Sequence, residues 1–143
     1  MPKLLVAIDP GMKGGVAFRA GTYTGHFSLV LEELRTRLKA WKEEWEVLVY
    51  IEKQWLWKNE RDVKTADKLI CNFCMIKGML FQLDIPWVEI PPRTWQSDVL
   101  GVGGDTKKKS LKFVLDQYEL DTKDDGIADA LALLHYACSQ ENL

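Results

Sequence analysis

Residues 4–11 read LLVAIDPG, a short and continuously apolar run that ends in Asp9 and a Pro-Gly turn. An apolar run of this length is typical of a central β-strand that is buried on both faces. Residues 47–52, VLVYIE, repeat the pattern and again end in a carboxylate, that of Glu52. If the two strands are parallel neighbours, Asp9 and Glu52 emerge together at one edge of a sheet.

The elements around these two strands indicate the class of fold. Residues 14–18 and 23–29 read as an antiparallel meander that continues from the first strand. The polar and basic residues 53–64 and the glycines at 101, 103 and 104 predict loops. Further elements are expected as a helix over 31–45, a helix from Thr65 or Asp67 to about Leu83, a strand over 86–90, and helices over 93–100, 106–118 and about 125–139. This order predicts an α/β fold with a five-stranded mixed sheet flanked by helices.

The length and composition fit one domain over residues 1–143, because 47% hydrophobic and 28% charged residues can form a core without a disordered tail. The N-terminus shows no secretory signal, and no apolar run approaches the ~20 residues of a membrane span, so we expect a cytoplasmic protein. The formal net charge of −2 argues only weakly against a nucleic-acid partner. Two divalent cations bound by acidic residues would change that charge to +2.

The helix expected to end near Leu83 is apolar around most of its circumference. Such a helix needs burial on two sides, and we expect the sheet on one side and a second copy of the chain on the other. Cys71 and Cys74 form a CxxC within it, but with no second cysteine pair and only His26 and His135 elsewhere, a zinc site lacks ligands. We therefore interpret both as buried thiols.

Residues 124–131, DDGIADAL, supply two further carboxylates. Asp125 and Asp129 are four residues apart, so on a helix they share one face, with roughly 5–6 Å between their Cβ atoms. The apolar residues that follow predict that this face is buried, where two like charges need a compensating cation. Small residues between the acids let the helix approach the sheet closely, so that they can reach Asp9 and Glu52.

Four convergent carboxylates form an oxygen-rich site suited to Mg²⁺ or Mn²⁺. Two such ions about 3.5–4 Å apart can activate water and stabilise the leaving oxygen of a phosphodiester. Each acid also has a structural alternative, with Asp9 as a turn former, Glu52 paired with a lysine, and Asp124 and Asp125 as helix caps. Capping does not explain Asp129, which falls in the second turn of the helix.

Several short motifs resemble the RuvC family in order and spacing. They are AIDPG at residues 7–11 followed by GVA at 15–17, IEK at 51–53, and DGIADALA at 125–132. The stretch PPRTWQ at 91–96 also resembles the small bacteriophage-type members. The resemblance covers nearly the whole chain. It implies an RNase H-like fold and a homodimeric, magnesium-dependent endonuclease that resolves four-way DNA (Holliday) junctions by paired symmetric nicks, in DNA recombination and repair.

The resemblance also assigns catalytic and metal-binding roles. Three acids match those of the family, namely Asp9, Glu52 and Asp129. The family's resolvases often space their last two acids three residues apart, a position that is Gly126 here. Asp125 therefore becomes the fourth acid, with Asp124 as the alternative.

DNA contacts are expected from a loop and from a basic run. Trp55 lies three residues after Glu52, where the family carries an aromatic residue that stacks on bases at the junction centre, and Trp57 could assist or could belong to the core. The family also carries a lysine just before the glycine loop. This chain has no lysine there, and Gln96 and Ser97 occupy that region.

The basic run falls near a family lysine close to the scissile phosphate, at a helix start where backbone N–H groups also favour phosphate. A solvated lysine face is the alternative. The lysines from which we expect DNA contacts are Lys53, Lys58, Lys107, Lys108 and Lys109.

Three other functions remain open. An RNA-processing nuclease would share the fold, and a junction-binding module would lack cleavage. An actin-like phosphotransferase also carries Asp-x-Gly followed by Gly-Val-Ala, but needs two such domains around a nucleotide. For a phage-encoded resolvase, we expect the cytoplasm of the bacterial host.

Overall fold

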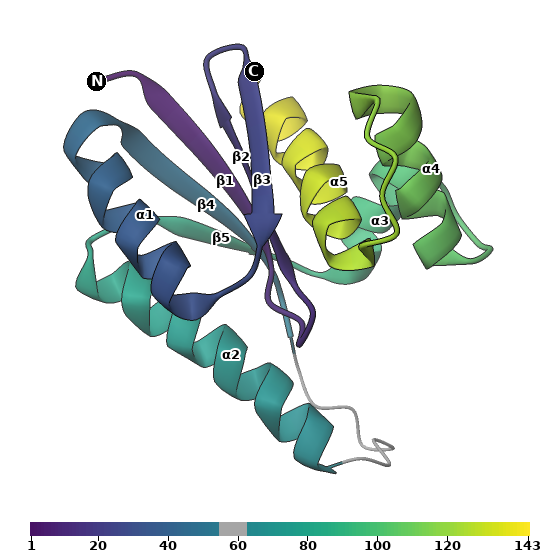
Figure 1. Ribbon diagram of the computed structural model, residues 1–143, viewed down its shortest axis with the longest axis horizontal. Helices are drawn as coiled ribbons and strands as arrows, with labels where there is room; N and C mark the ends of the chain where they lie inside the picture. Colours follow the sequence, from purple (N-terminus) through teal and green to yellow (C-terminus); the bar gives the residue numbers. More distant parts are fainter. Residues whose placement is uncertain (55–62) are drawn as a thin grey trace.

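The structure is a computed structural model that describes residues 1–54 and 63–143, apart from the side chains of residues 63–66 and 69 (Figure 1). The described residues form a five-stranded sheet in the order β3-β2-β1-β4-β5, with helices on both faces. The mixed α/β architecture predicted from the order of apolar runs is confirmed.

The first apolar run forms the central strand of this sheet. β1 (Lys3–Asp9) pairs antiparallel with β2 (Gly15–Ala20), which pairs antiparallel with β3 (Tyr23–Ser28). On its other side β1 pairs parallel with β4 (Glu46–Glu52), and β4 pairs parallel with β5 (Trp87–Ile90). Because α1 connects β1–β3 to β4 as a crossover, the parallel pairing follows the expected rule.

The helices form one layer on each face of the sheet (Figure 1). α1 (Leu31–Glu44) and α2 (Val63–Gln82) cover one face. α5 (Asp125–Gln140) lies on the opposite face, and α3 (Pro92–Leu100) and α4 (Thr106–Tyr118) pack against it. Alternate residues of β1 therefore belong to two different hydrophobic cores, as the period-2 geometry of a strand requires.

α2 begins earlier than expected, by two residues from Thr65 or by four from Asp67. The helix begins at Val63 rather than at Thr65 or Asp67, so the expected loop over residues 53–64 is shorter. Neither glycine nor proline occurs immediately before Thr65, and nothing in the sequence stops the helix from extending backwards.

The two cysteines of the CxxC lie on the outer side of α2. Cys71 and Cys74 are free thiols, but they are exposed, so the expectation that they are buried was wrong. The turn of the helix places Phe73 against the sheet and leaves its neighbours facing outward. Met75 and Phe81 share this outer side with exposed fractions of 57% and 72%. The second covering partner expected for this helix stays a prediction.

A polar latch ties the end of α5 to the amino-terminal edge of the sheet. Lys3 Nζ donates to Glu141 Oε1 at 3.1 Å, and the Tyr50 hydroxyl donates to Glu141 Oε2 at 2.8 Å. Both chain ends therefore lie at the edge of the sheet opposite the carboxyl end of β1 (Figure 1). Among the described helices we find none with the length and apolar character needed to cross a bilayer.

Candidate active site

Asp9 and Glu52 emerge at the same edge of the sheet, as the sequence predicts. Ile8 on β1 is the register partner of Ile51 on β4, so the two residues that follow them leave parallel neighbouring strands at one level. Both side chains are half-buried and lie close enough for Glu52 to perturb the pKa of Asp9.

Asp9 sits in the least favourable electrostatic position of the group. Burial raises its pKa well above the usual range, and repulsion from Glu52 and Asp129, with a smaller contribution from Asp125, adds to the effect. Its Oδ1 atom accepts a hydrogen bond from the backbone N–H of Gly11 at 3.0 Å, which acts in the opposite direction. The Asp-Pro-Gly turn thus both ends the strand and orients the carboxylate.

Glu52 accepts hydrogen bonds from two neutral donors. The indole Nε1 of Trp95 donates to its Oε2 at 2.8 Å, and Gln54 Nε2 donates to its Oε1 at 3.1 Å. Burial raises the pKa of Glu52 to about 7, although both hydrogen bonds favour the charged form. Repulsion from Asp129 contributes to the increase.

The first turn of α5 approaches the sheet through direct backbone contact. A Cβ atom on Gly126 would lie 2.0 Å from the backbone oxygen of Lys13, and one on Gly15 would lie 2.5 Å from the oxygen of Gly126. No side chain fits at either position, so glycine is required at both. The small residues of this helix thus let it approach the sheet closely, as the sequence predicts. This approach brings the acids of α5 up to the ends of β1 and β4.

Asp129 faces this strand edge and is anchored from α4. The hydroxyl of Ser110, a fully buried residue, donates to its Oδ1 at 2.6 Å. Burial raises the pKa of Asp129 to about 6, and repulsion from Asp125 adds to this increase, whereas the Ser110 hydrogen bond and Lys107 favour the charged form.

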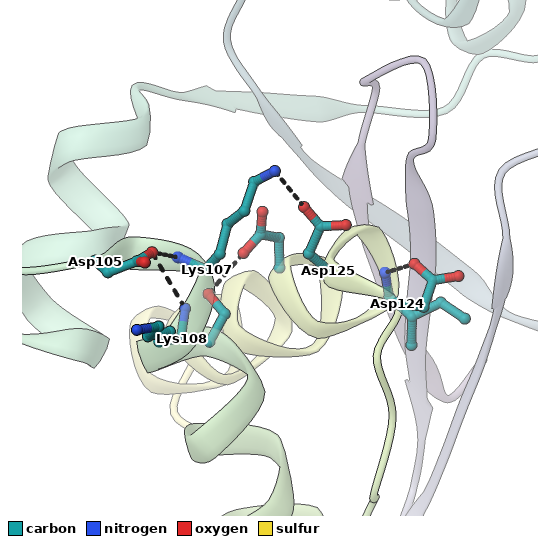
Figure 2. Close-up of polar contacts among 8 residues, drawn as sticks. Asp105, Lys107, Lys108, Asp124 and Asp125 are labelled. Atoms are coloured by element: carbon teal, nitrogen blue, oxygen red, sulfur yellow. Dashed lines mark hydrogen bonds and ion pairs between the residues drawn. The ribbon is translucent and has the colours of Figure 1, made fainter.

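Asp125 and its neighbour Asp124 have different surroundings. Lys107 Nζ lies 3.4 Å from Asp125 Oδ2, and this ion pair reaches across from α4 to α5 (Figure 2). Asp124 is the N-cap of α5, where its Oδ1 accepts from the backbone N–H of Ile127 at 3.0 Å. The capping alternative therefore applies to Asp124, and Asp125 is the better candidate for the fourth acid.

These carboxylates suit a hard divalent cation. Four oxygen-donor groups lie near one another, and burial together with repulsion from neighbouring acids raises the pKa of three of them. A bound cation would favour the charged form of each. Several of their oxygen atoms already accept hydrogen bonds from the protein. Within the described part of the chain, no group of three or more acidic, His or Cys side chains is arranged as a ready set of metal ligands.

The three adjacent lysines at the start of α4 have three different environments. Lys107 faces Asp125, and Lys108 is exposed. Lys109 Nζ donates to the carbonyl oxygens of Gly101, Val102 and Gly103, so its ammonium holds the glycine loop together. Lys109 thus acts within the protein, and its expected DNA contact stays untested.

A side-chain cap occupies two backbone donors at the start of α4. The carboxylate of Asp105 accepts from the backbone N–H groups of Lys107 and Lys108 (Figure 2). This aspartate caps the helix, and the expectation that N–H groups there favour a phosphate stays a prediction.

The expected aromatic loop lies outside the described residues. Trp55, Trp57 and Lys58 fall in that segment, so their roles stay predictions. Lys53 is described and exposed, and its backbone N–H donates to the carbonyl of Ile90 at 2.8 Å.

Trp95 and Ser110 are the site residues that the sequence analysis missed. Both are fully buried, and each donates to one of the acids. The motif PPRTWQ does contain Trp95, but a tryptophan within a short helix reads as a core residue, and a single serine in a basic helix gives no signal.

A mixed sheet in the order 3-2-1-4-5, with carboxylates at the ends of its two central parallel strands and on the last helix, defines the RNase H-like class of fold. Solved structures that match the chain include two of RuvC. RuvC from T. thermophilus in complex with a Holliday junction substrate matches with a TM-score of 0.62 and 20% sequence identity, over 98% of this chain and 96% of that one. A second Thermus thermophilus RuvC structure matches with a TM-score of 0.55 and 17% identity, over 97% and 96%.

The sequence itself matches no family model and no curated protein. At 17–20% identity the structural likeness shows that the chain has the RuvC fold. The activity has to be argued from the residues of the site.

Proposed function

We propose that this protein is a divalent-metal-dependent endonuclease that resolves four-way DNA junctions by paired symmetric nicks. The observation that carries the proposal is the approach of Asp9, Glu52 and Asp129 at one sheet edge, close enough for Glu52 and Asp129 to raise the pKa of Asp9 and for Asp129 to raise that of Glu52. The likeness of the fold to that of a RuvC solved with a Holliday junction substrate supports the proposal.

The side chains of such a site have different roles. Asp9, Glu52, Asp125 and Asp129 would hold Mg²⁺ or Mn²⁺, most simply as two ions, which when bound supply activation of water and stabilisation of the leaving oxygen. Trp95 fixes the orientation of the Glu52 carboxylate through a donor that never titrates.

Two further residues support the acids. The uncharged hydroxyl of Ser110 donates a hydrogen bond to Asp129 and so orients its carboxylate. Lys107 pairs with Asp125 and carries a positive charge to the rim of the site, where it can bind a phosphate of the substrate.

A homodimer would match the two-fold symmetry of a junction and give one site for each nicked strand. The exposed outer side of α2, with Met75 and Phe81, is the surface we assign to it. We expect Phe81→Glu to convert a dimer to a monomer in sedimentation analysis, while Lys112→Glu, at an exposed position of α4 on the other face of the sheet, leaves the dimer unchanged. A monomeric wild-type protein would contradict this assignment.

The cleavage proposal is tested with a synthetic four-way junction labelled on each strand in turn. We expect Mg²⁺-dependent nicks at symmetric positions in two strands of like polarity, and loss of nicking in Asp9→Asn and Asp129→Asn. Asp116→Asn, an exposed carboxylate on α4, is the matched control. Full activity in both site variants would contradict the proposal, and preferred cleavage of structured RNA in competition would favour an RNA-processing nuclease.

A further inference from the structure

A shallow hollow of about 470 Å³ opens beside Asp125, at the end of the sheet that carries the acids. It lies between the β1–β2 turn and the segment that leads into α5. Its lining residues are Met12, Lys13, Ser28, Leu29, Lys123 and Asp125, together with Gly14 and Asp124. The hollow therefore borders the proposed active site but is built mainly from residues without a role in it.

Two of the residues that line this hollow are lysines, and two, Asp124 and Asp125, are acids. Lys13 and Lys123 are both exposed, and neither forms an ion pair within the part of the chain that the structure describes. Lys107, by contrast, forms an ion pair with Asp125. An exposed lysine that has no ion-pair partner is available to contact a phosphate group.

The backbone fixes where these lysines stand relative to the acids. The carbonyl oxygen of Lys13 packs against Gly126 so closely that no Cβ atom fits between them. Lys123 immediately precedes Asp124, whose side chain caps α5. Both lysines are thus attached to rigid parts of the elements that carry Asp9 and Asp125, and a ligand bound to them is held in register with the acids.

The hollow and Lys107 lie on different sides of Asp125. Figure 2 shows Lys107 and Asp124 on either side of Asp125, and the hollow is on the Asp124 side. A polyanion that crosses the acids would meet Lys107 before them and the two hollow lysines after them.

We infer that this hollow binds the sugar–phosphate backbone of the strand being cut, with Lys13 and Lys123 each contacting a phosphate. This inference rests on the proposed function and extends it by a substrate track that the sequence analysis did not include. Each lysine that contacts a phosphate contributes about 0.9 to the slope of log K against log salt concentration. Its loss therefore weakens binding about eightfold at 0.1 M salt, independently of base sequence.

The test measures the affinity for a four-way junction in EDTA at about five salt concentrations, from roughly 0.05 to 0.3 M. The variants are Lys13→Gln, Lys123→Gln and the double variant. Lys39→Gln, an exposed lysine on α1 on the opposite face of the sheet, is the matched control. We expect each single variant to lower the salt slope by about 0.9 and the double variant by about 1.8, with the control unchanged. Thermal midpoints equal to that of the wild type verify that the variants are folded.

Two other results would overturn the inference in distinguishable ways. If the wild type binds and nicks the junction but both variants behave like Lys39→Gln at every salt concentration, the track is wrong and the proposed function stands. If the wild type neither binds the junction in preference to duplex DNA nor nicks it, the proposed function fails and the inference fails with it.

Discussion

Asp129→Asn should stabilise the metal-free protein at neutral pH while removing the activity proposed for it. Burial and Asp125 raise the pKa of Asp129 from 3.8 to about 6, so the charged form is disfavoured in the folded state. Between those two values the folded protein binds more protons than the unfolded chain, and stability falls as the pH rises. The penalty is absent near pH 4 and complete above pH 6.

A difference of about two pKa units corresponds to at most about 3 kcal/mol, and the partial exposure of Asp129 reduces this to between about 1 and 3 kcal/mol. The asparagine keeps a carbonyl oxygen that can accept from Ser110, so the packing is preserved. Urea unfolding in EDTA at pH 7.5 and pH 4 measures the effect, with Asp116→Asn as the control. Addition of Mg²⁺ should reverse the order, since only the wild type gains stability from binding. A variant no more stable than the wild type at pH 7.5 in EDTA would refute the reasoning.

Two other substitutions examine how the site is held. Gly126→Ala places a Cβ atom 2.0 Å from the Lys13 carbonyl oxygen and should cost about 3 kcal/mol in urea unfolding, whereas Gly78→Ala, inside α2 with open space around it, should stabilise by about 0.5–1 kcal/mol. Equal stabilities would contradict the close backbone contact. Trp95→Phe removes the donor to Glu52 and should lower the free energy of unfolding by about 2 kcal/mol and weaken Mg²⁺ binding in calorimetry about 10- to 100-fold. Unchanged metal affinity would show that the indole N–H does not position the carboxylate.

The fold was predictable because each decisive signal is local. The apolar run that ends at Asp9 can be satisfied only at the centre of a sheet, and the same pattern ending at Glu52 places its neighbour. The four-residue spacing of Asp125 and Asp129 likewise fixes a shared helix face wherever the helix packs. Backbone geometry alone carries these features from the sequence to the structure.

The supporting contacts could not be predicted because they join segments that are distant in sequence. The hydrogen bond from Trp95 to Glu52 spans 43 residues, and that from Ser110 to Asp129 spans 19. The contacts of Lys109 could not be predicted either, because the path of the preceding loop decides whether its ammonium group contacts carbonyl oxygens or solvent.

The latch between Lys3, Tyr50 and Glu141 has a practical consequence for handling the protein. Because it gathers both termini at the edge of the sheet far from the acids, an affinity tag, a fluorophore or a surface tether can be attached at either end. Immobilised molecules would then present their acidic edge outward, which suits observation of individual DNA junctions as they arrive and leave.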